Sequence, residues 1–255
     1  TAELIRPILR GRDIKRYGYD WANLYLIATF PACHYDIEKY PAVKNYLLSF
    51  EEENLRDSGY DWVADNYLAD FCKQKLAQTG KFIEIAGKRI TIGNTPEKAR
   101  KRTSNKWFET QDSISYWEDF SKPKVMWKII GCNINFCFDE RQLICNNAVD
   151  IMVGDRNNLI QFVGLMNSKL FDWYLKLTTE AEVQGGGIQL YVTTLEKTLL
   201  KLDFQQAFTD IVYQRIENQV TDEAVDKAVF EEYRLTTEEK DFILQDRRVN
   251  RNRED

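Results

Sequence analysis

A segment in the second half of the chain constrains the fold most, because its hydrophobic pattern changes once along its length. Three strand-like segments come first, at residues 125–130, 134–138 and 143–153, with polar turns between them. Apolar residues then recur at the i, i+3, i+4, i+7 spacing of an amphipathic helix from Leu159 to Leu177. An amphipathic helix needs an apolar surface to cover. We therefore expect an α/β fold of the α+β type, in which helices pack against a mostly antiparallel sheet.

Four other segments carry local signals. Residues 24–28 form an apolar run that is typical of a buried strand, and Pro41 stands where a helix would begin. Residues 82–92 alternate apolar and polar side chains around a glycine turn, which predicts a hairpin. The polar turn at residues 139–142 suits an antiparallel connection, whereas residues 5–17, with Pro and Gly among them, are expected to be irregular.

The C-terminal part is expected to be helical. One helix would begin at Thr221, and the Thr236-x-x-Glu239 spacing predicts a capping box at the start of another. In these helices Asp226, Glu238 and Lys240 faintly resemble a nuclease constellation. Because their surroundings are helical and acidic, we expect a solvated helix face there rather than an active site.

The scarce residue types exclude most catalytic chemistry. The chain has a single histidine, His34, and its five cysteines include no C-x-x-C pair. Neither a glycine-rich phosphate loop nor an Asn-Pro-Pro-Tyr amine-methylation motif is present. We therefore predict no catalytic residues, no metal ligands and no cofactor in this chain, and reduced, structural thiols. Without a long apolar run or a leader-like start, we expect no membrane contact and a cytoplasmic protein.

The charges are segregated along the chain. The net charge of −5 argues weakly against a nucleic-acid partner, but residues 73–106 hold ten Lys or Arg and two Glu, a local balance of +8. Residues 51–70 carry seven acidic residues and one basic residue, and residues 217–246 carry ten and three. A local basic patch is what phosphate binding requires, although such a patch is also typical of a solvated helix face.

Six segments together are similar to one known family. In chain order they are Arg6-Pro7-Ile8-Leu9-Arg10-Gly11-Arg12-Asp13-Ile14-Lys15-Arg16-Tyr17, Tyr40-Pro41-Ala42-Val43, Lys106-Trp107-Phe108-Glu109-Thr110-Gln111, Phe120-Ser121-Lys122-Pro123-Lys124-Val125-Met126-Trp127, Leu165-Met166-Asn167-Ser168-Lys169-Leu170-Phe171-Asp172-Trp173-Tyr174 and Phe230-Glu231-Glu232-Tyr233-Arg234-Leu235-Thr236. The ordered set resembles the C-terminal specificity domain of TaqI-type adenine methyltransferases and of type IIG (Eco57I-like) restriction-modification enzymes.

The resemblance implies a recognition domain for double-stranded DNA at residues 1–200, with a variable basic insertion at about 58–105, and a helical part at 201–255 that packs on it. It also implies an N-terminal methyltransferase domain of the same polypeptide, sometimes preceded by a nuclease domain. That upstream domain would bind S-adenosylmethionine and methylate an adenine flipped out of the duplex. The chain alone would not be catalytic.

The candidate DNA contacts fall into three groups. Two arginines would lie near the junction with the catalytic domain: Arg10 and Arg12. The basic candidates of the insertion and its end are Lys88, Arg89, Lys98, Arg100, Lys101, Arg102 and Lys106. Weaker candidates for base contacts, for which a turn or surface role is the alternative, are Gln111, Asn133, Asn135, Gln184 and Gln189.

A second interpretation stays open at this stage. The chain could be a non-catalytic interaction or scaffold domain whose basic segment meets an acidic partner or its own acidic tail. The two interpretations differ in one observation, because only DNA binding predicts a steep fall of affinity for duplex DNA with salt.

Overall fold

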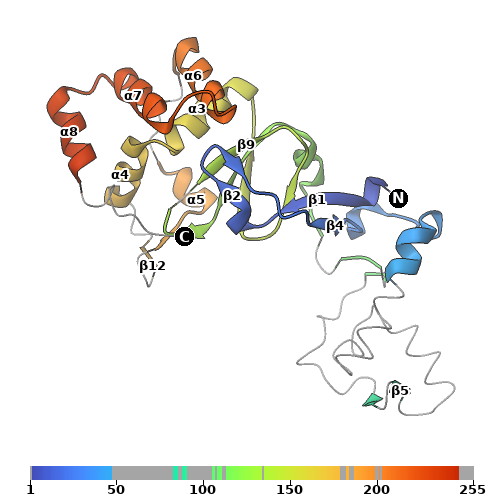
Figure 1. Ribbon diagram of the computed structural model, residues 1–255. Coiled ribbons are helices and arrows are strands. Elements are labelled where there is room, and N and C mark those ends of the chain that lie inside the picture. The colour runs from blue at the N-terminus through green and yellow to red at the C-terminus, as the bar shows by residue number, and fades with distance from the viewer. Residues whose placement is uncertain are drawn as a thin grey trace. The chain divides into compact units, whose positions relative to one another are not determined.

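The computed structural model describes residues 2–47, 83–85, 88–90, 105–106, 108–110, 113–133, 135–178, 182–183, 187–198, 201 and 203–246. The chain divides into two compact units. Unit 1 consists of Thr1–Arg6 and Tyr25–Ser115, and unit 2 consists of Pro7–Leu24 and Tyr116–Asp255. The elements are labelled in Figure 1.

Unit 1 is built from short elements. Three of them are the 3₁₀ helices η1 (Ala2–Leu4), η3 (Pro31–Cys33) and η4 (Ile37–Lys39), and the others are strand β4 (Tyr25–Ile27), a helix over residues 41–47, and the antiparallel hairpin of β5 (Ile83–Ile85) and β6 (Lys88–Ile90). The helix that begins at Pro41 and the hairpin confirm the sequence predictions.

Unit 1 has its own small core. Leu4, Ile37, Val43 and Phe108 are buried together. The Thr29 hydroxyl donates a hydrogen bond to the carbonyl oxygen of Phe108 at 2.6 Å, which joins segments that are distant in sequence. The prediction of a buried strand at residues 24–28 was wrong in its burial. Tyr25 is 57% exposed and Leu24 41% exposed, and only Ala28, beyond the end of β4, is fully buried.

The centre of unit 2 is a three-stranded antiparallel sheet in the order β11 (Val149–Val153), β7 (Lys124–Lys128), β9 (Phe136–Asp139). Alternate residues of these strands enter two different cores. Val125, Trp127 and Phe138 belong to the core on the helical side, whereas Met126 and Cys137 belong to the core on the other side. The sheet is therefore covered on both faces.

Unit 2 also contains smaller, separate sheets. Strand β8 (Ile130–Gly131) pairs with β13 (Gly187–Gln189), which pairs with β12 (Glu182–Val183); β2 (Ile14–Lys15) pairs with β3 (Gly18–Tyr19). These pairings are antiparallel. The chain also contains the 3₁₀ helices η2 (Gly11–Asp13) and η5 (Trp117–Ser121).

Two predictions fail at β1 (Ile5–Leu9) and β10 (Ile144–Cys145). Residues 5–17 contain β1 and β2 and are not irregular, because Leu9 is fully buried and the N–H of Ile8 is bonded to the carbonyl oxygen of Leu24. The turn at 139–142 does not lead to an antiparallel partner of β9. Strand β10 instead pairs in parallel with β1, Ile8 lying opposite Ile144.

The helix predicted from Leu159 to Leu177 is two helices, α3 (Arg156–Met166) and α4 (Lys169–Thr178). Side chains of the intervening residues end one helix and begin the other. The Ser168 hydroxyl donates to the carbonyl oxygen of Leu165 and accepts from the N–H of Phe171. The apolar periodicity runs through this break, so it could not show the break.

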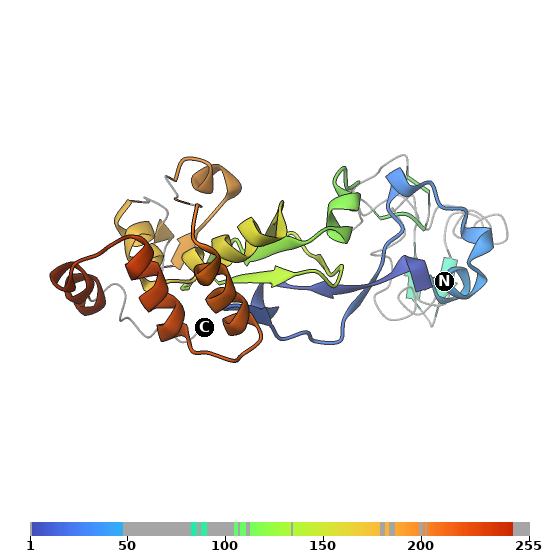
Figure 2. The ribbon, with the colours of Figure 1, turned by 90° about the horizontal axis from the view of Figure 1, so that it is seen from above.

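The remaining helices are α5 (Val192–Leu195), α6 (Gln206–Ile216), α7 (Asp222–Glu232) and α8 (Thr237–Gln245). Helices α6 and α7 lie beside α3 in both views (Figure 1 and Figure 2). A Cβ atom added at Gly164 of α3 would lie 2.3 Å from Val212 of α6, so glycine permits this close approach. The capping box of Thr236 and Glu239 is present as predicted. The fold class is thus confirmed as mixed α/β.

Candidate functional site

The two arginine candidates of unit 2 stand in η2 and just before it, in opposite surroundings. Arg10 donates to both oxygens of Asp13, through Nε at 3.0 Å and Nη2 at 2.8 Å. This hydrogen bonding lowers the pKa of Asp13 and holds its carboxylate ionised. Arg12 is exposed. Arg10 therefore stabilises the turn, and Arg12 is the side chain that the turn presents to solvent.

Close packing fixes the same turn. A Cβ atom added at Gly11 would lie 3.2 Å from the carbonyl oxygen of Ala148 and 3.3 Å from its Cβ atom. Glycine thus lets η2 lie against the loop before β11. The peptide that carries Arg12 is held by this contact on one side and by the Arg10–Asp13 pair on the other.

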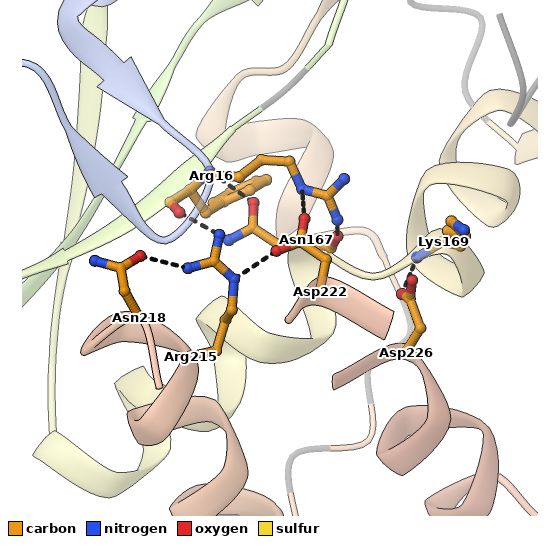
Figure 3. Close-up of polar contacts among 8 residues, drawn as sticks. Arg16, Asn167, Lys169, Arg215, Asn218, Asp222 and Asp226 are labelled. Carbon is orange, nitrogen blue, oxygen red and sulfur yellow. Dashed lines mark hydrogen bonds and ion pairs between the residues drawn. The ribbon is translucent and has the colours of Figure 1, made fainter. Parts of the chain in front are cut away.

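A polar cluster joins the turn between β2 and β3 to the helices, and Figure 3 shows the side chains of Arg16, Arg215 and Asp222 pointing toward one another. We call it the arginine cluster; its members are Arg16, Tyr17, Asn167, Arg215 and Asp222. Arg16 donates to the carbonyl oxygen of Asn167, and its Nε lies 3.3 Å from Asp222 Oδ2. Arg215 Nε lies 2.5 Å from Asp222 Oδ1, and its guanidinium carbon lies 4.8 Å from the ring centre of Tyr17.

The arginine cluster has a structural role, because it connects two parts of unit 2. Tyr17 is only 2% exposed and has a left-handed backbone (φ 64°), and burial raises the pKa of its hydroxyl. Asn167 connects the cluster to the central sheet, because its side-chain amide donates to the carbonyl oxygen of Phe136 and accepts from the N–H of the same residue. The cluster holds the turn between β2 and β3 against the helical layer.

A pocket of about 250 Å³ lies among α4, α7 and α8, and its lining residues are Lys169, Glu223, Asp226, Lys227, Phe230, Lys240 and Leu244. The expectation that Asp226 lies on a solvated face was wrong. Its side chain is 4% exposed and accepts the backbone N–H of Lys169 at 2.8 Å, so it caps the start of α4 (Figure 3). Burial raises its pKa.

The resemblance of Asp226, Glu238 and Lys240 to a nuclease constellation does not extend to the structure. Asp226 and Lys240 line the same pocket, whereas Glu238 is exposed and does not line it. Within the described part of the chain, no group of three His, Cys, Asp or Glu residues is arranged to hold a metal ion.

The amide candidates are dispersed. Asn135 is 7% exposed, and Asn133 is half-buried. Gln189 of β13 lies opposite Ile130, which is 53% exposed, and donates to the hydroxyl of Tyr191. Gln189 is thus the member of this group that lies beside an exposed apolar and aromatic surface. Gln111 and Gln184 lie outside the described residues.

The structure describes only part of the basic insertion. Lys88 and Arg89 belong to β6, where they lie opposite Ile85 and Glu84 of β5. Lys106 is exposed, and its ammonium lies 5.6 Å from the ring centre of Phe108. The remaining basic candidates lie outside the described residues, and these are Lys98, Arg100, Lys101 and Arg102.

Sequence reasoning missed a second pocket, which we call the edge pocket. Its volume is about 270 Å³, and its lining residues are Tyr116, Asp119, Cys145, Val149, Asp150, Ile151, Val153 and Val192. Asp150 accepts a hydrogen bond from the backbone N–H of Val192, and burial raises the pKa of its carboxyl. Burial also raises the pKa of Cys145 to about 12, so its thiol stays protonated. An aspartate within an otherwise apolar strand was the one available signal.

One known family, described as the TaqI-like C-terminal specificity domain, matches residues 6–198 of the chain. The matched range contains the edge pocket, η2 and the sheet of unit 2, whereas helices α6, α7 and α8 follow it. No curated protein matches the sequence. None of the helices in the described ranges is both long enough and apolar enough to cross a membrane.

Proposed function

Because the chain belongs to the TaqI-like C-terminal specificity domains, a family of DNA-recognition domains, we propose that it selects the target sequence in double-stranded DNA for an adenine-specific methyltransferase or a type IIG restriction-modification enzyme. The family match over residues 6–198 carries this proposal. The catalytic domain, with its S-adenosylmethionine and in some relatives a nuclease, would precede this domain in the same polypeptide. This chain would supply DNA binding and sequence specificity.

The rigidity of unit 2 supports this role. Phosphate contacts fix the position of a protein on the duplex, and they do so only if the contacting side chains are themselves held in place. Arg12 meets this condition, because Gly11 and the Arg10–Asp13 pair fix its peptide and the arginine cluster holds the following strands.

The candidate contacts divide by chemistry. The basic side chains are suited to contact phosphates, and such contacts carry no information about sequence. They are Arg12, Lys88, Arg89 and the basic residues from Lys98 to Lys106. Gln189, beside the exposed Tyr191 and Ile130, is suited to base edges, because an amide can donate and accept together. Asn135 is too deeply buried to reach a base in this conformation.

Fluorescence anisotropy with labelled duplexes tests the proposal. The chain should bind DNA with an affinity that falls steeply as salt rises, and the double charge reversal Lys88→Glu/Arg89→Glu should weaken binding and flatten the salt dependence. Arg12→Glu should do the same to a smaller extent. Lys227→Glu is the matched control, since Lys227 is exposed on α7 outside the matched range.

Two results would contradict DNA binding by this chain. Binding that does not respond to salt, or charge reversals that leave affinity and salt dependence unchanged, would contradict the proposal. They would favour the interaction-domain interpretation, in which the basic segment meets an acidic protein partner.

A further inference from the structure

The edge pocket lies at a free edge of the central sheet of unit 2. Within the described part of the chain, β11 pairs with β7 on one side and with no strand on the other. On that open side Tyr116 and Asp119 come from η5 and the residue before it, and Val192 comes from the first turn of α5. The pocket is therefore walled by four elements, β10, β11, η5 and α5, and is open to solvent between them.

The lining combines one aromatic wall, an apolar floor and one acceptor. Tyr116 is 50% exposed, and Ile151, Val153 and Val192 supply branched apolar surface. The half-buried carboxyl of Asp150 accepts the N–H of Val192 and has further acceptor capacity. The second carboxyl, that of Asp119, is already bonded to Lys122 Nζ at 2.7 Å.

These groups select among ligand classes. The carboxyl groups disfavour a phosphate inside the pocket, whereas the aromatic ring and apolar floor favour a flat, neutral ring. No described cation forms an ion pair with Asp150, and burial raises the pKa of its carboxyl, so the site suits a neutral hydrogen-bond donor. At about 270 Å³ the pocket is slightly smaller than the sites of drug-sized ligands, which begin at about 300 Å³. A single amino-bearing heterocycle combines these properties.

We propose that the edge pocket takes one unstacked nucleobase of the bound duplex, an adenine, a cytosine or a guanine, whose exocyclic amine donates to Asp150 while its ring packs on Tyr116. Proteins that take a base out of the stack hold it in this way, between aromatic or apolar side chains with polar groups at its edge. Lys122, 57% exposed beside Asp119, would lie near the phosphate outside the pocket. The inference rests on the proposed function.

A fluorescent base tests the pocket directly. Selection from a random duplex library gives the preferred sequence of this chain, and 2-aminopurine is then placed at each position in turn. The fluorescence of 2-aminopurine rises when the base leaves the stack, so binding of the isolated chain should raise it at one position. A mismatch at that position should tighten binding, because an unpaired base is easier to extrude.

Three variants test whether the edge pocket is where the base binds. Asp150→Asn keeps an acceptor for the N–H of Val192 but presents amide donors, so preference for an amino-bearing base over thymine at that position should fall about tenfold. Tyr116→Ala should abolish the fluorescence rise, whereas Tyr116→Phe should retain it. Asp210→Asn, an exposed change on α6, is the control and should alter nothing. Circular dichroism confirms that each variant is folded.

The outcomes separate the two proposals. A chain that binds no duplex defeats both the proposed function and the pocket. A chain that binds DNA with a sequence preference unchanged by Asp150→Asn and Tyr116→Ala, and with no fluorescence rise at any position, keeps the proposed function and overturns the pocket.

Discussion

The two edges of the central sheet of unit 2 carry an aspartate each, in opposite surroundings. On β9, Asp139 is 2% exposed and lies 2.5 Å from the fully buried Lys124, and it also accepts the backbone N–H groups of Arg141 and Leu143. On β11, Asp150 lies opposite Trp127 in an open pocket, where it accepts the backbone N–H of Val192 and forms no ion pair with a cation of the described residues. The β9 edge thus holds a buried, paired carboxylate and is called the closed edge. The β11 edge holds a carboxyl in a pocket open to solvent and is called the open edge.

This difference separates a structural carboxylate from one that can bind a ligand. A buried charge must be paired, and Asp139 has a cation and two amides. Asp150 has spare acceptor capacity and faces solvent. Asp226 is intermediate, because it is as buried as Asp139 but caps a helix instead of pairing with a cation.

Breaking the pair on the closed edge should have the largest effect on stability. Lys124→Met leaves Asp139 buried without its cation, which should lower the free energy of unfolding by about 3–5 kcal/mol. Lys122→Met is the matched control, since it removes an exposed ion pair worth about 1 kcal/mol or less. Urea denaturation measures both. Equal losses in the two variants would show that Asp139 is not held by Lys124.

The sequence predicted the layers of this fold because their signals are local. Apolar alternation marked the strands around Met126 and Phe136, and the Thr236–Glu239 capping box marked the start of α8. The pairing of β1 with β10 escaped prediction because Ile8 and Ile144 are far apart in the chain, and proline and arginine in β1 hid the strand pattern.

The candidate site was less predictable than the fold. Arg10 and Arg12 are equivalent in sequence, and only their contacts show that Asp13 occupies the first. Asp226 stands in an acidic helix, so its burial depends on the packing of α7 against α4, which no local pattern records. The edge pocket is formed by elements that meet only in the folded chain.

An intermediate loss of stability is expected at the intermediate carboxyl. Asp226→Ala removes the acceptor for the N–H of Lys169 at the start of α4, and loss of such a cap costs about 0.5–2 kcal/mol. Asp226→Asn keeps an oxygen that can accept the same N–H and should lose less. Chemical denaturation of both variants checks this order. Equal losses in the two variants would show that the charge, and not the hydrogen bond to the N–H of Lys169, is what α4 requires.

The smallest change in stability should come from a substitution of Asp150 at the open edge, and it should be a gain instead of a loss. Because the pKa of Asp150 is raised by burial, the folded state holds its proton to a higher pH than the unfolded state does. Stability from this group therefore falls as pH rises from its unfolded pKa, near 3.8, through its folded value. Asp150→Asn removes that dependence, so the variant should melt at a slightly higher temperature than the wild type at pH 7, and the gain should shrink on acidification. Asp13, whose pKa is lowered by Arg10, supplies the contrast, since Asp13→Asn should destabilise at pH 7 and less so in acid. Should Asp150→Asn lower the melting temperature at pH 7, the carboxylate would be stabilising the fold as Asp139 does, and the contrast between the two edges would no longer hold.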